Sequence, residues 1–283
     1  MILLADSGSS KTDWYLIRKD QPGISLRSEG LNPYFVSAEK ADQIIQKEVV
    51  PFVFPDKINT IVFYGAGCSR NTKRDLISDV LKENFPRADI DVFTDLLGTA
   101  RALYGAEAGI AGILGTGSNL CYYNGKGISD SIPSLGYLLG DEGSGASLGF
   151  SLLRAFLRQE LPETISRDFT RRYGLEKEQI LDAMYHQPDP NRRAAAFTVF
   201  LKEKLDDNYI REMILNHFRY FVHKDLKPLA IRNGLTSASF TGSVAFHFEQ
   251  LLKEAATEYG IHIQRVEASP IHGLVGFHTP LNW

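Results

Sequence analysis

The sequence predicts an α/β protein of two domains that share the core order βββαβαβα, with extra helices inserted in the second domain. Three observations support this prediction. The 283 residues suggest about two domains by length. Strand-type apolar runs alternate with stretches of helical spacing, and the order of elements that begins at Ile2 begins again at Ile110. We expect the two halves to face a central cleft, where ligands are commonly held.

The first half predicts a β-meander followed by alternating strands and helices. Ser37 is the expected N-cap of a helix whose apolar residues recur at helical spacing as far as Val49. The expected strands cover residues 2–6, 14–18, 24–28, 58–64 and 90–93, and the later helices cover residues 71–84 and 96–104.

The second half restarts with strands at residues 110–114 and 120–123. A mostly helical stretch, residues 141–230, is the expected insertion, because its apolar residues fall at helical spacing. A strand at 239–241, a helix from Gly242 to Tyr259, a strand at 261–266 and a helix at 270–277 complete the repeat.

Composition is that of an ordinary soluble globular protein, with 43% hydrophobic and 23% charged residues. The net charge of −3, with no basic stripe, argues against nucleic acid as a partner. No apolar stretch reaches membrane-spanning length, and no basic segment precedes the short apolar run at the N-terminus. Cys68 and Cys121 suit a reducing compartment better than a disulfide scaffold. We therefore expect a cytoplasmic protein without a membrane partner.

Two turns rich in glycine and hydroxyl residues carry the most information about function. The first contains Gly8, Ser9, Ser10, Lys11 and Thr12, and the second contains Gly115, Thr116, Gly117 and Ser118. Glycine lets the backbone approach a ligand closely, and successive N–H groups in such turns form a concavity for anions. Either turn alone is consistent with an ordinary hairpin. Because the two stand at the head of equivalent runs, we interpret them as paired contacts to a polyphosphate.

Two acids follow strands in the first half. Asp95 follows the strand at 90–93 and could accept a proton from a substrate hydroxyl, or it could simply cap the next helix. Asp6 ends the first strand, where a carboxylate could hold Mg²⁺ directly or through water, or could simply start a turn.

The string from Gly140 to Gly145 places two acids between glycines ahead of a helix. These acids could hydrogen-bond a polyol or lie near a metal, or Asp141 or Ser144 could serve as the helix cap. The seven histidines show no metal-ligand spacing, and no Ser-His-Asp or Cys-His pattern indicates a nucleophilic hydrolase.

Taken together, these segments resemble the N-acetylglucosamine kinase branch of the BadF/BadG/BcrA/BcrD ATPase family, within the sugar kinase/Hsp70/actin superfamily, over nearly the whole chain. The glycine turns match the family's two phosphate loops, and residues 136–145 match its Gly-Asp-Glu-Gly-Ser signature. Residues 241–244 are similar to its adenosine motif, and residues 270–276 to its closing helix. Leu135 departs from the pattern, since sugar kinases of the family often carry Trp there.

The resemblance implies two actin-like (ribonuclease H-like) domains, formed by residues 1–112 with 270–283 and by residues 113–269. It implies ATP-dependent phosphorylation of an amino sugar, N-acetylglucosamine or a related N-acetylhexosamine, at O6, with ATP and Mg²⁺ as cofactors. Asp95 is then the general base and Asp6 the metal-holding residue. The expected nucleotide contacts are the two glycine turns with Gly242 and Ser243, and the expected sugar contacts are Asn32, Asn119, Gly136 and Asp141. A homodimer is also implied.

Two other functions stay open. The same family includes ATPase activators of 2-hydroxyacyl-CoA dehydratases, which hold a [4Fe–4S] cluster on cysteines across a dimer, although Cys68 and Cys121 do not resemble that pair. The other alternative is a non-catalytic regulator that binds sugar or ATP.

Overall fold

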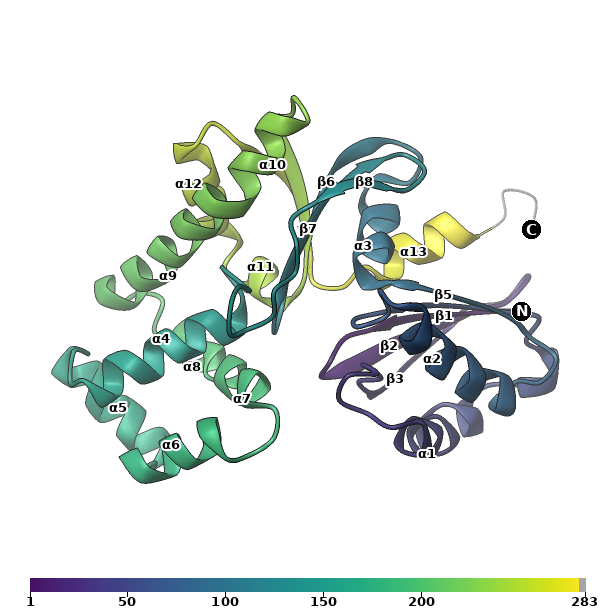
Figure 1. Cartoon of the computed structure of the whole chain (residues 1–283), viewed down its shortest axis with the longest axis horizontal. Coiled ribbons are helices and arrows are strands. Elements are labelled where there is room, and N and C mark those ends of the chain that lie inside the picture. Colours follow the sequence, from purple (N-terminus) through teal and green to yellow (C-terminus); the bar gives the residue numbers. More distant parts are fainter. Residues whose placement is uncertain (280–283) are drawn as a thin grey trace. The chain divides into compact units, whose positions relative to one another are not determined.

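The computed structural model describes residues 1–279 and divides into two compact units. The first unit comprises residues 1–108, 123–128 and those from 269 on, and the second comprises residues 109–122 and 129–268. Each unit is built around a five-stranded sheet (Figure 1). The units differ from the predicted domains mainly at residues 123–128, a hairpin tip that belongs to the first unit.

The first unit follows the predicted order βββαβαβα. Its elements are β1 (Ile2–Ser7), β2 (Lys11–Ile17), β3 (Ile24–Glu29), α1 (Ala38–Glu48), two 3₁₀ turns (Val50–Phe52 and Pro55–Lys57), β4 (Thr60–Gly65), α2 (Asn71–Asn84), β5 (Asp89–Thr94) and α3 (Asp95–Tyr104). The strand order is β3-β2-β1-β4-β5, with β1, β4 and β5 parallel to one another. The C-terminal helix α13 (Ile271–His278) packs against α3.

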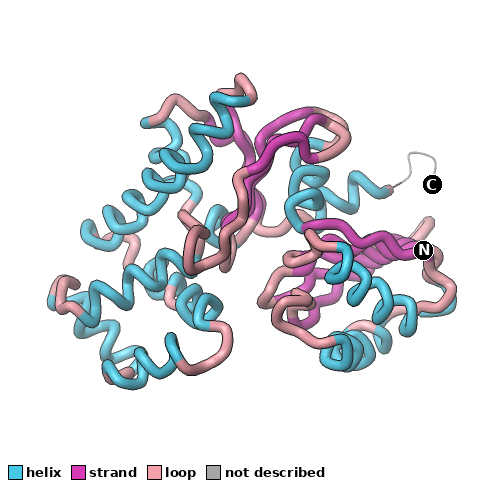
Figure 2. The backbone as a smooth tube through the Cα atoms, in the orientation of Figure 1, coloured by secondary structure: helices cyan, strands magenta, loops and turns pink. Residues whose placement is uncertain are grey.

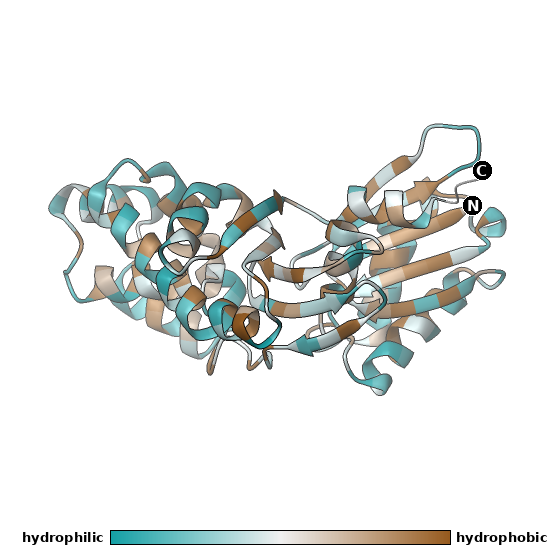
Figure 3. Ribbon diagram, turned by 90° about the horizontal axis from the view of Figure 1, so that it is seen from above, coloured by the Kyte–Doolittle hydropathy of each residue, from teal (hydrophilic) through white to brown (hydrophobic). Residues whose placement is uncertain are grey.

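The central strands of this sheet are apolar along most of their length and are coloured brown in Figure 3. Leu3 and Leu4 of β1 and Ile61 and Phe63 of β4 are all fully buried. A strand that is covered on both faces needs such a continuous apolar run, whereas a half-exposed strand alternates. The sequence pattern therefore selects β1 and β4 as the centre of the sheet.

The second unit repeats the same sheet. Its strands are β6 (Ala108–Leu114), β7 (Ser118–Asn124), β8 (Ile128–Ser131), β9 (Ser237–Thr241) and β10 (His262–Glu267). The order β10-β9-β6-β7-β8 is that of the first sheet read as β5-β4-β1-β2-β3. The predicted internal repeat is therefore confirmed, although β8 has no counterpart among the predicted strands.

The inserted helices lie between β8 and β9 and are drawn in cyan in Figure 2. They are α4 (Gly145–Leu157), α5 (Glu163–Tyr173), α6 (Lys177–Tyr185), α7 (Pro190–Ala196), α8 (Thr198–Glu203), α9 (Asn208–Phe221), a π-helical turn (Val222–Leu226) and α10 (Lys227–Arg232). Their apolar faces and the second sheet share one core, in which Phe218, Phe221 and Phe240 are buried.

After β9 the chain forms two helices, α11 (Ser243–His247) and α12 (Glu249–Glu258), where the sequence predicts one. Phe248 separates them, because its φ of −116° and ψ of 26° are not helical. Among the helices of residues 1–279, none combines the length and apolar character that a membrane span requires.

Candidate functional site

The two acids predicted to carry chemistry lie at one edge of the first sheet. Asp6 is near the carboxyl end of β1, and Asp95 directly follows β5. Because β1, β4 and β5 run parallel, their carboxyl ends meet at the same edge, which is where open α/β sheets bind ligands. The structure therefore brings these two sequence-predicted residues into electrostatic contact, even though 88 positions separate them in the chain.

Both carboxyl groups have raised pKa values. Burial, and secondly the charge of Asp95, raise the pKa of Asp6 to about 7. Burial raises the pKa of Asp95 to about 6, against the opposing effect of its hydrogen bond from the Leu96 amide. Two carboxyls that share a desolvated site resist double ionisation, so a cation or a positioned proton would be favoured there.

Helix α3 begins with Thr94 as its N-cap, since the Thr94 hydroxyl accepts a hydrogen bond from the Leu97 amide at 3.2 Å. The alternative in which Asp95 is the cap is therefore wrong. Asp95 is the first residue of the helix, and its Oδ1 accepts a hydrogen bond from the neighbouring Leu96 amide at 2.9 Å.

The first glycine turn is held by buried hydroxyls. Ser7 Oγ and Thr12 Oγ1 lie 2.8 Å apart, and both residues are fully buried. Thr12 also donates to the Glu29 carbonyl, so its hydroxyl supports the turn from inside. Asn32, a predicted sugar contact, donates through Nδ2 to Ser9 Oγ at 2.8 Å. The predicted sugar and phosphate contacts of this unit are thus directly linked.

Charged residues that the sequence pattern did not single out surround Asp6. Asp13 pairs with Lys11 and with Arg27, which together hold the pKa of Asp13 below its usual range despite partial burial. Ser269 donates to Asp13 Oδ2 at 3.2 Å, and its hydroxyl also opposes the rise in the pKa of Asp6. Lys11, predicted to contact phosphate, is therefore ion-paired with a carboxylate that it shares with Arg27.

The second glycine turn is fixed to the start of helix α4. The amide of Gly145 donates to the Gly115 carbonyl at 2.8 Å, and that of Ala146 donates to the Thr116 carbonyl at 3.0 Å. Ser144 caps this helix, because its hydroxyl accepts the Ser147 amide. The first turn of α4 therefore holds the predicted phosphate loop in place.

Asp141 contacts this loop from the signature string. Its Oδ1 accepts the Ser118 amide at 3.3 Å, and its Oδ2 lies only 2.9 Å from where a Cβ on Gly117 would be. Asp141 itself has a φ of 61°, an unusual conformation for a residue other than glycine, and burial raises its pKa. A side chain at position 117 would therefore force this carboxylate to move.

The predicted adenosine motif lies against the same loop. Gly242 has a φ of 111°, and a Cβ on it would come within 2.3 Å of the Leu114 carbonyl oxygen. Close approach of β9 to the end of β6 therefore requires glycine here. The structure thus brings the predicted nucleotide residues Gly115, Gly117 and Gly242 together within the second unit.

A cavity of about 320 Å³ opens beside this loop in the second unit. Ser118, Asn119 and Asp141, all predicted site residues, line one side of it. The remaining polar residues of its wall are Ser134, Glu142, Tyr220, Lys224 and Asp225, and its apolar residues include Leu120, Ile132, Pro133, Leu135 and Phe221. Gly136, the other predicted sugar contact, begins the turn between Leu135 and Gly140, since its carbonyl accepts the Gly140 amide at 2.8 Å.

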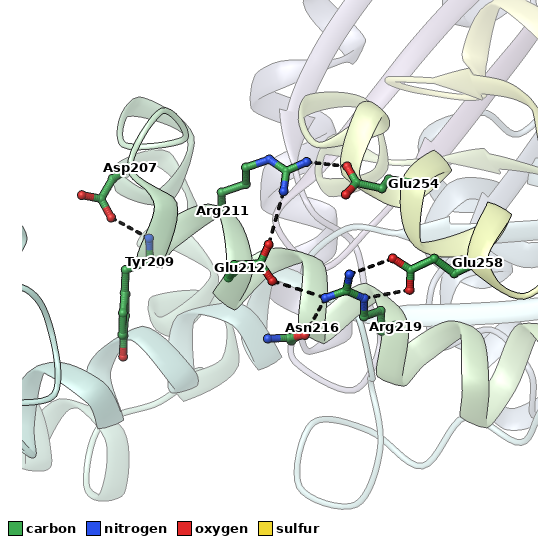
Figure 4. A network of polar contacts seen from close by, with 8 residues as sticks. All are labelled: Asp207, Tyr209, Arg211, Glu212, Asn216, Arg219, Glu254 and Glu258. Atoms are coloured by element: carbon green, nitrogen blue, oxygen red, sulfur yellow. Dashed lines mark hydrogen bonds and ion pairs between the residues drawn. The ribbon is translucent and has the colours of Figure 1, made fainter.

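Helix α9, which supplies the far wall of the cavity, is anchored to α12 by ion pairs (Figure 4). Arg219 binds Glu258 through two hydrogen bonds of 2.7 and 2.8 Å, and Arg211 binds Glu254. Bidentate pairs of this kind fix orientation more firmly than single contacts. The π-helical turn that follows α9 therefore starts from a fixed position.

Ser134, Tyr220, Lys224 and Asp225 are polar lining residues that the sequence did not reveal, whereas Glu142 is the second acid of the string from Gly140 to Gly145. Tyr220, Lys224 and Asp225 lie in the predicted helical insertion, and no motif or spacing distinguishes them from other surface residues of a helix.

A second unpredicted cluster joins α4 to α9. His217 contacts Ser151 Oγ at 2.9 Å and Ser147 Oγ at 3.3 Å, and burial lowers the pKa of His217 to about 4. A neutral, buried imidazole between two hydroxyls is consistent with packing of the two helices.

Solved structures similar to the chain include proteins named as sugar kinases. A protein of Porphyromonas gingivalis with the provisional name N-acetylglucosamine kinase is 37% identical, with 98% of each chain covered and a TM-score of 0.92. A protein of Chromobacterium violaceum with the same provisional name is 15% identical, with 98% of each chain covered and a TM-score of 0.77. A ROK family glucokinase of Streptomyces griseus, solved with glucose and AMPPNP, is 14% identical, with 98% and 97% covered and a TM-score of 0.59.

No family model and no curated protein matches the chain. The two structures under 25% identical show a common fold, whereas the 37% identity over 98% of both chains reaches the level of family membership.

Proposed function

The chain belongs to the actin-like sugar kinase superfamily, and from this premise we propose that it transfers the γ-phosphoryl group of ATP to O6 of N-acetylglucosamine or a related N-acetylhexosamine. The observation that carries this proposal is the pair Asp6 and Asp95 at the carboxyl edge of the first sheet, with raised pKa values. A base of pKa about 6 is ionised at neutral pH and is yet basic enough to accept a hydroxyl proton.

In this proposal the second unit holds the nucleotide. The Gly117 amide is proposed to face the phosphates, since the Gly115 amide donates to the Gly117 carbonyl at 3.0 Å and so closes the loop, and Gly242 and Ser243 are proposed to lie on the adenosine side. Support comes from the tight packing of these segments, in which Gly242 abuts the end of β6 and α4 secures the loop. Phosphoryl transfer depends mainly on positioning and on neutralising charge, so such preorganised amides suit the reaction.

The acceptor hydroxyl is proposed to meet Asp95, with Asn32, Asn119 and Asp141 binding the rest of the sugar. Asp95 takes the proton as the hydroxyl oxygen forms its bond to the γ-phosphorus, and the bond from that phosphorus to the bridging oxygen breaks to release ADP. The Leu96 amide orients the carboxylate. Asn32 is 6% exposed and holds Ser9, so one side chain would couple the sugar to the first phosphate loop.

Mg²⁺ fits the charge distribution beside Asp6. Burial, and after it the charges of Asp95 and Asp13, raise the pKa of Asp6, and a cation beside these carboxylates would offset their mutual repulsion. Mg²⁺ typically binds one or two protein carboxylates together with substrate phosphates and water, and in residues 1–279 no group of three metal-binding side chains forms a closed site. Bound Mg²⁺ would neutralise charge on the phosphates, and Asp6 would hold it.

The iron–sulfur alternative is disfavoured by the cysteines. Cys68 and Cys121 are both 0% exposed, and burial raises the pKa of Cys68 to about 12. Cluster ligation needs accessible thiolates, which these environments oppose.

A coupled ADP-release assay with ATP and Mg²⁺ tests the proposed activity. The acceptors are N-acetylglucosamine, N-acetylmannosamine, N-acetylmuramic acid, glucosamine and glucose. We expect turnover with an N-acetylhexosamine and, by mass spectrometry and NMR of the product, a phosphate on O6. Sugar binding without any turnover would instead support a non-catalytic regulator.

Replacing Gly117 by valine should abolish ATP binding, because its side chain collides with the Asp141 carboxylate and enters the phosphate path. A ligand that binds only the native state stabilises it by about 2.7 kcal/mol at a hundredfold excess over Kd. We expect the wild type to show such a thermal shift with ATP and Mg²⁺ and Gly117→Val to show none. Gly127→Val is the matched control, since nothing lies within 4 Å of a Cβ at Gly127. An unchanged thermal shift in a folded Gly117→Val protein would show that the loop does not contact the phosphates and is an ordinary hairpin.

A further inference from the structure

The cavity of the second unit combines three kinds of wall. Carboxylates of Glu142 and Asp225 provide hydrogen-bond acceptors, and Lys224 provides a cationic donor. The third wall is apolar and includes Leu120, Ile132 and Phe221. At about 320 Å³, the cavity has a volume of roughly ten water molecules. It can therefore hold a polar substituent together with part of a sugar ring.

Asp225 is the most distinctive residue of this wall. It lies in the π-helical turn Val222–Leu226, and such local π geometry is frequent at functional sites. Burial, and secondly the charge of Glu142, raise the pKa of Asp225 to about 6, so its carboxyl is ionised at neutral pH. Within residues 1–279, the carboxylates of Asp225 and Glu142 have no hydrogen-bond donor from the protein. A half-buried carboxylate without a donor is a strong acceptor for a ligand.

We propose that this cavity binds the acylamino group of the acceptor sugar, with the Asp225 carboxylate accepting the amide N–H and the Lys224 ammonium donating to the acyl carbonyl. The apolar wall then covers the acyl methyl group. This inference rests on the proposed function, since it assigns the feature by which that kinase recognises an N-acylated hexosamine.

The three walls match the three parts of an acetamido group, one donor, one acceptor and one apolar methyl. A hexose offers a hydroxyl at the same position, which can satisfy the carboxylate but gives the exposed Lys224 no acyl carbonyl and the apolar wall no methyl group. The preference for an N-acyl group would therefore come mainly from the added hydrogen bonds, because an apolar wall alone discriminates weakly. Because the cavity volume exceeds that of an acetyl group, a slightly longer acyl chain should also fit.

Isothermal titration calorimetry without ATP tests the cavity separately from catalysis. We expect N-acetylglucosamine to bind the wild type at least about tenfold more tightly than glucose, the effect of one or two charge-assisted hydrogen bonds. N-propionylglucosamine should bind within about threefold of N-acetylglucosamine, since one extra methylene has a small effect in an apolar pocket. Equal binding of N-acetylglucosamine and glucose, or binding of neither, would overturn the inference.

Variants of Asp225 identify the residue responsible. Asp225→Leu should weaken binding of N-acetylglucosamine about tenfold and leave glucose nearly unchanged, whereas Asp225→Asn, which keeps an acceptor oxygen, should retain most of the affinity. Lys224→Met should likewise lower the preference for N-acetylglucosamine. Asp206→Leu and Asp206→Asn are matched controls, because Asp206 is exposed and does not line the cavity.

The outcomes separate the two proposals. Loss of the N-acetyl preference in Asp225→Leu, together with rescue by Asp225→Asn, supports the inference even if no sugar is phosphorylated. A preference that survives Asp225→Leu in a folded protein contradicts the inference while leaving the kinase activity standing. Melting temperatures close to that of the wild type establish that each variant is folded.

Discussion

Asp95→Asn should lower kcat by about 10²–10⁴-fold, the usual contribution of a general base. The amide has nearly the size of the carboxylate and can still face the sugar hydroxyl, so the affinity for sugar should change little. Thr94, not Asp95, caps α3, so no loss of helix stability is expected to accompany the loss of rate. Steady-state kinetics and a melting curve of this variant measure both effects.

The pH dependence gives a second test of Asp95. Since its pKa is raised to about 6, the base is ionised above that value and protonated below it. The kcat of the wild type should therefore fall as the pH falls through about 6. Asp79→Asn, an exposed site in α2, is the control and should behave as the wild type does. Full activity of Asp95→Asn would rule out Asp95 as the base and make Asp141 the next candidate.

Asp6→Asn should make the ligand-free protein more stable at pH 8 while removing its Mg²⁺-dependent activity. A carboxylate whose pKa is raised to about 7 is ionised at pH 8 only at an energetic cost to the folded state. The amide carries no charge and avoids that cost. It is also a poor substitute for a carboxylate that holds Mg²⁺, so kcat and the thermal shift with ATP and Mg²⁺ should both fall sharply.

The sign of the pH effect follows from proton linkage. Between about pH 4 and pH 7, folded Asp6 retains a proton that the unfolded chain has lost, because burial and Asp95 raise its folded pKa. The stability that this proton contributes is complete below pH 4 and is lost as the pH rises through 7. Relative to the wild type, Asp6→Asn should therefore gain stability with rising pH, on the order of 3 kcal/mol by pH 8.

Urea unfolding at several pH values from 5 to 8 measures this gain. Comparing variant with wild type cancels groups that titrate in both proteins, such as His217, whose pKa is lowered. The free energy of unfolding of the exposed Asp79→Asn variant should differ from that of the wild type by the same amount at every pH. If the difference in free energy of unfolding between Asp6→Asn and the wild type does not change with pH, Asp6 is not the titrating group.

Much of the fold could be predicted because its elements follow simple periodicities. The bounds of α2, Asn71–Asn84, agree with the prediction, since its apolar residues keep helical spacing and the chain turns sharply on either side. β8 was missed because Ile128 is the only apolar residue among its four. The break at Phe248 was missed because the apolar spacing continues through it from α11 into α12.

The site could be predicted only where residues follow strands or glycine turns. Asp6, Asp95 and Gly117 occur at such places, and the structure gives each a close electrostatic or steric partner. Asp225 could not be found in this way, because its environment depends on a π-helical turn and on Glu142, more than 80 positions away. Their roles in binding and catalysis stay predictions until the variants are measured.

The two sheets have the same strand order but carry very different connections at one equivalent position. Between β3 and β4 the chain adds α1 and two short turns, whereas between β8 and β9 it adds the whole series α4 to α10. The wall with Lys224 and Asp225 belongs to that series, while Asp6 and Asp95 belong to the other half of the duplication. If both proposals hold, the residues that select the acylamino group and the residues that carry the chemistry belong to different halves of the duplication. Exchanging the connection between β8 and β9 would then change the acceptor preference while leaving Asp6 and Asp95 in place.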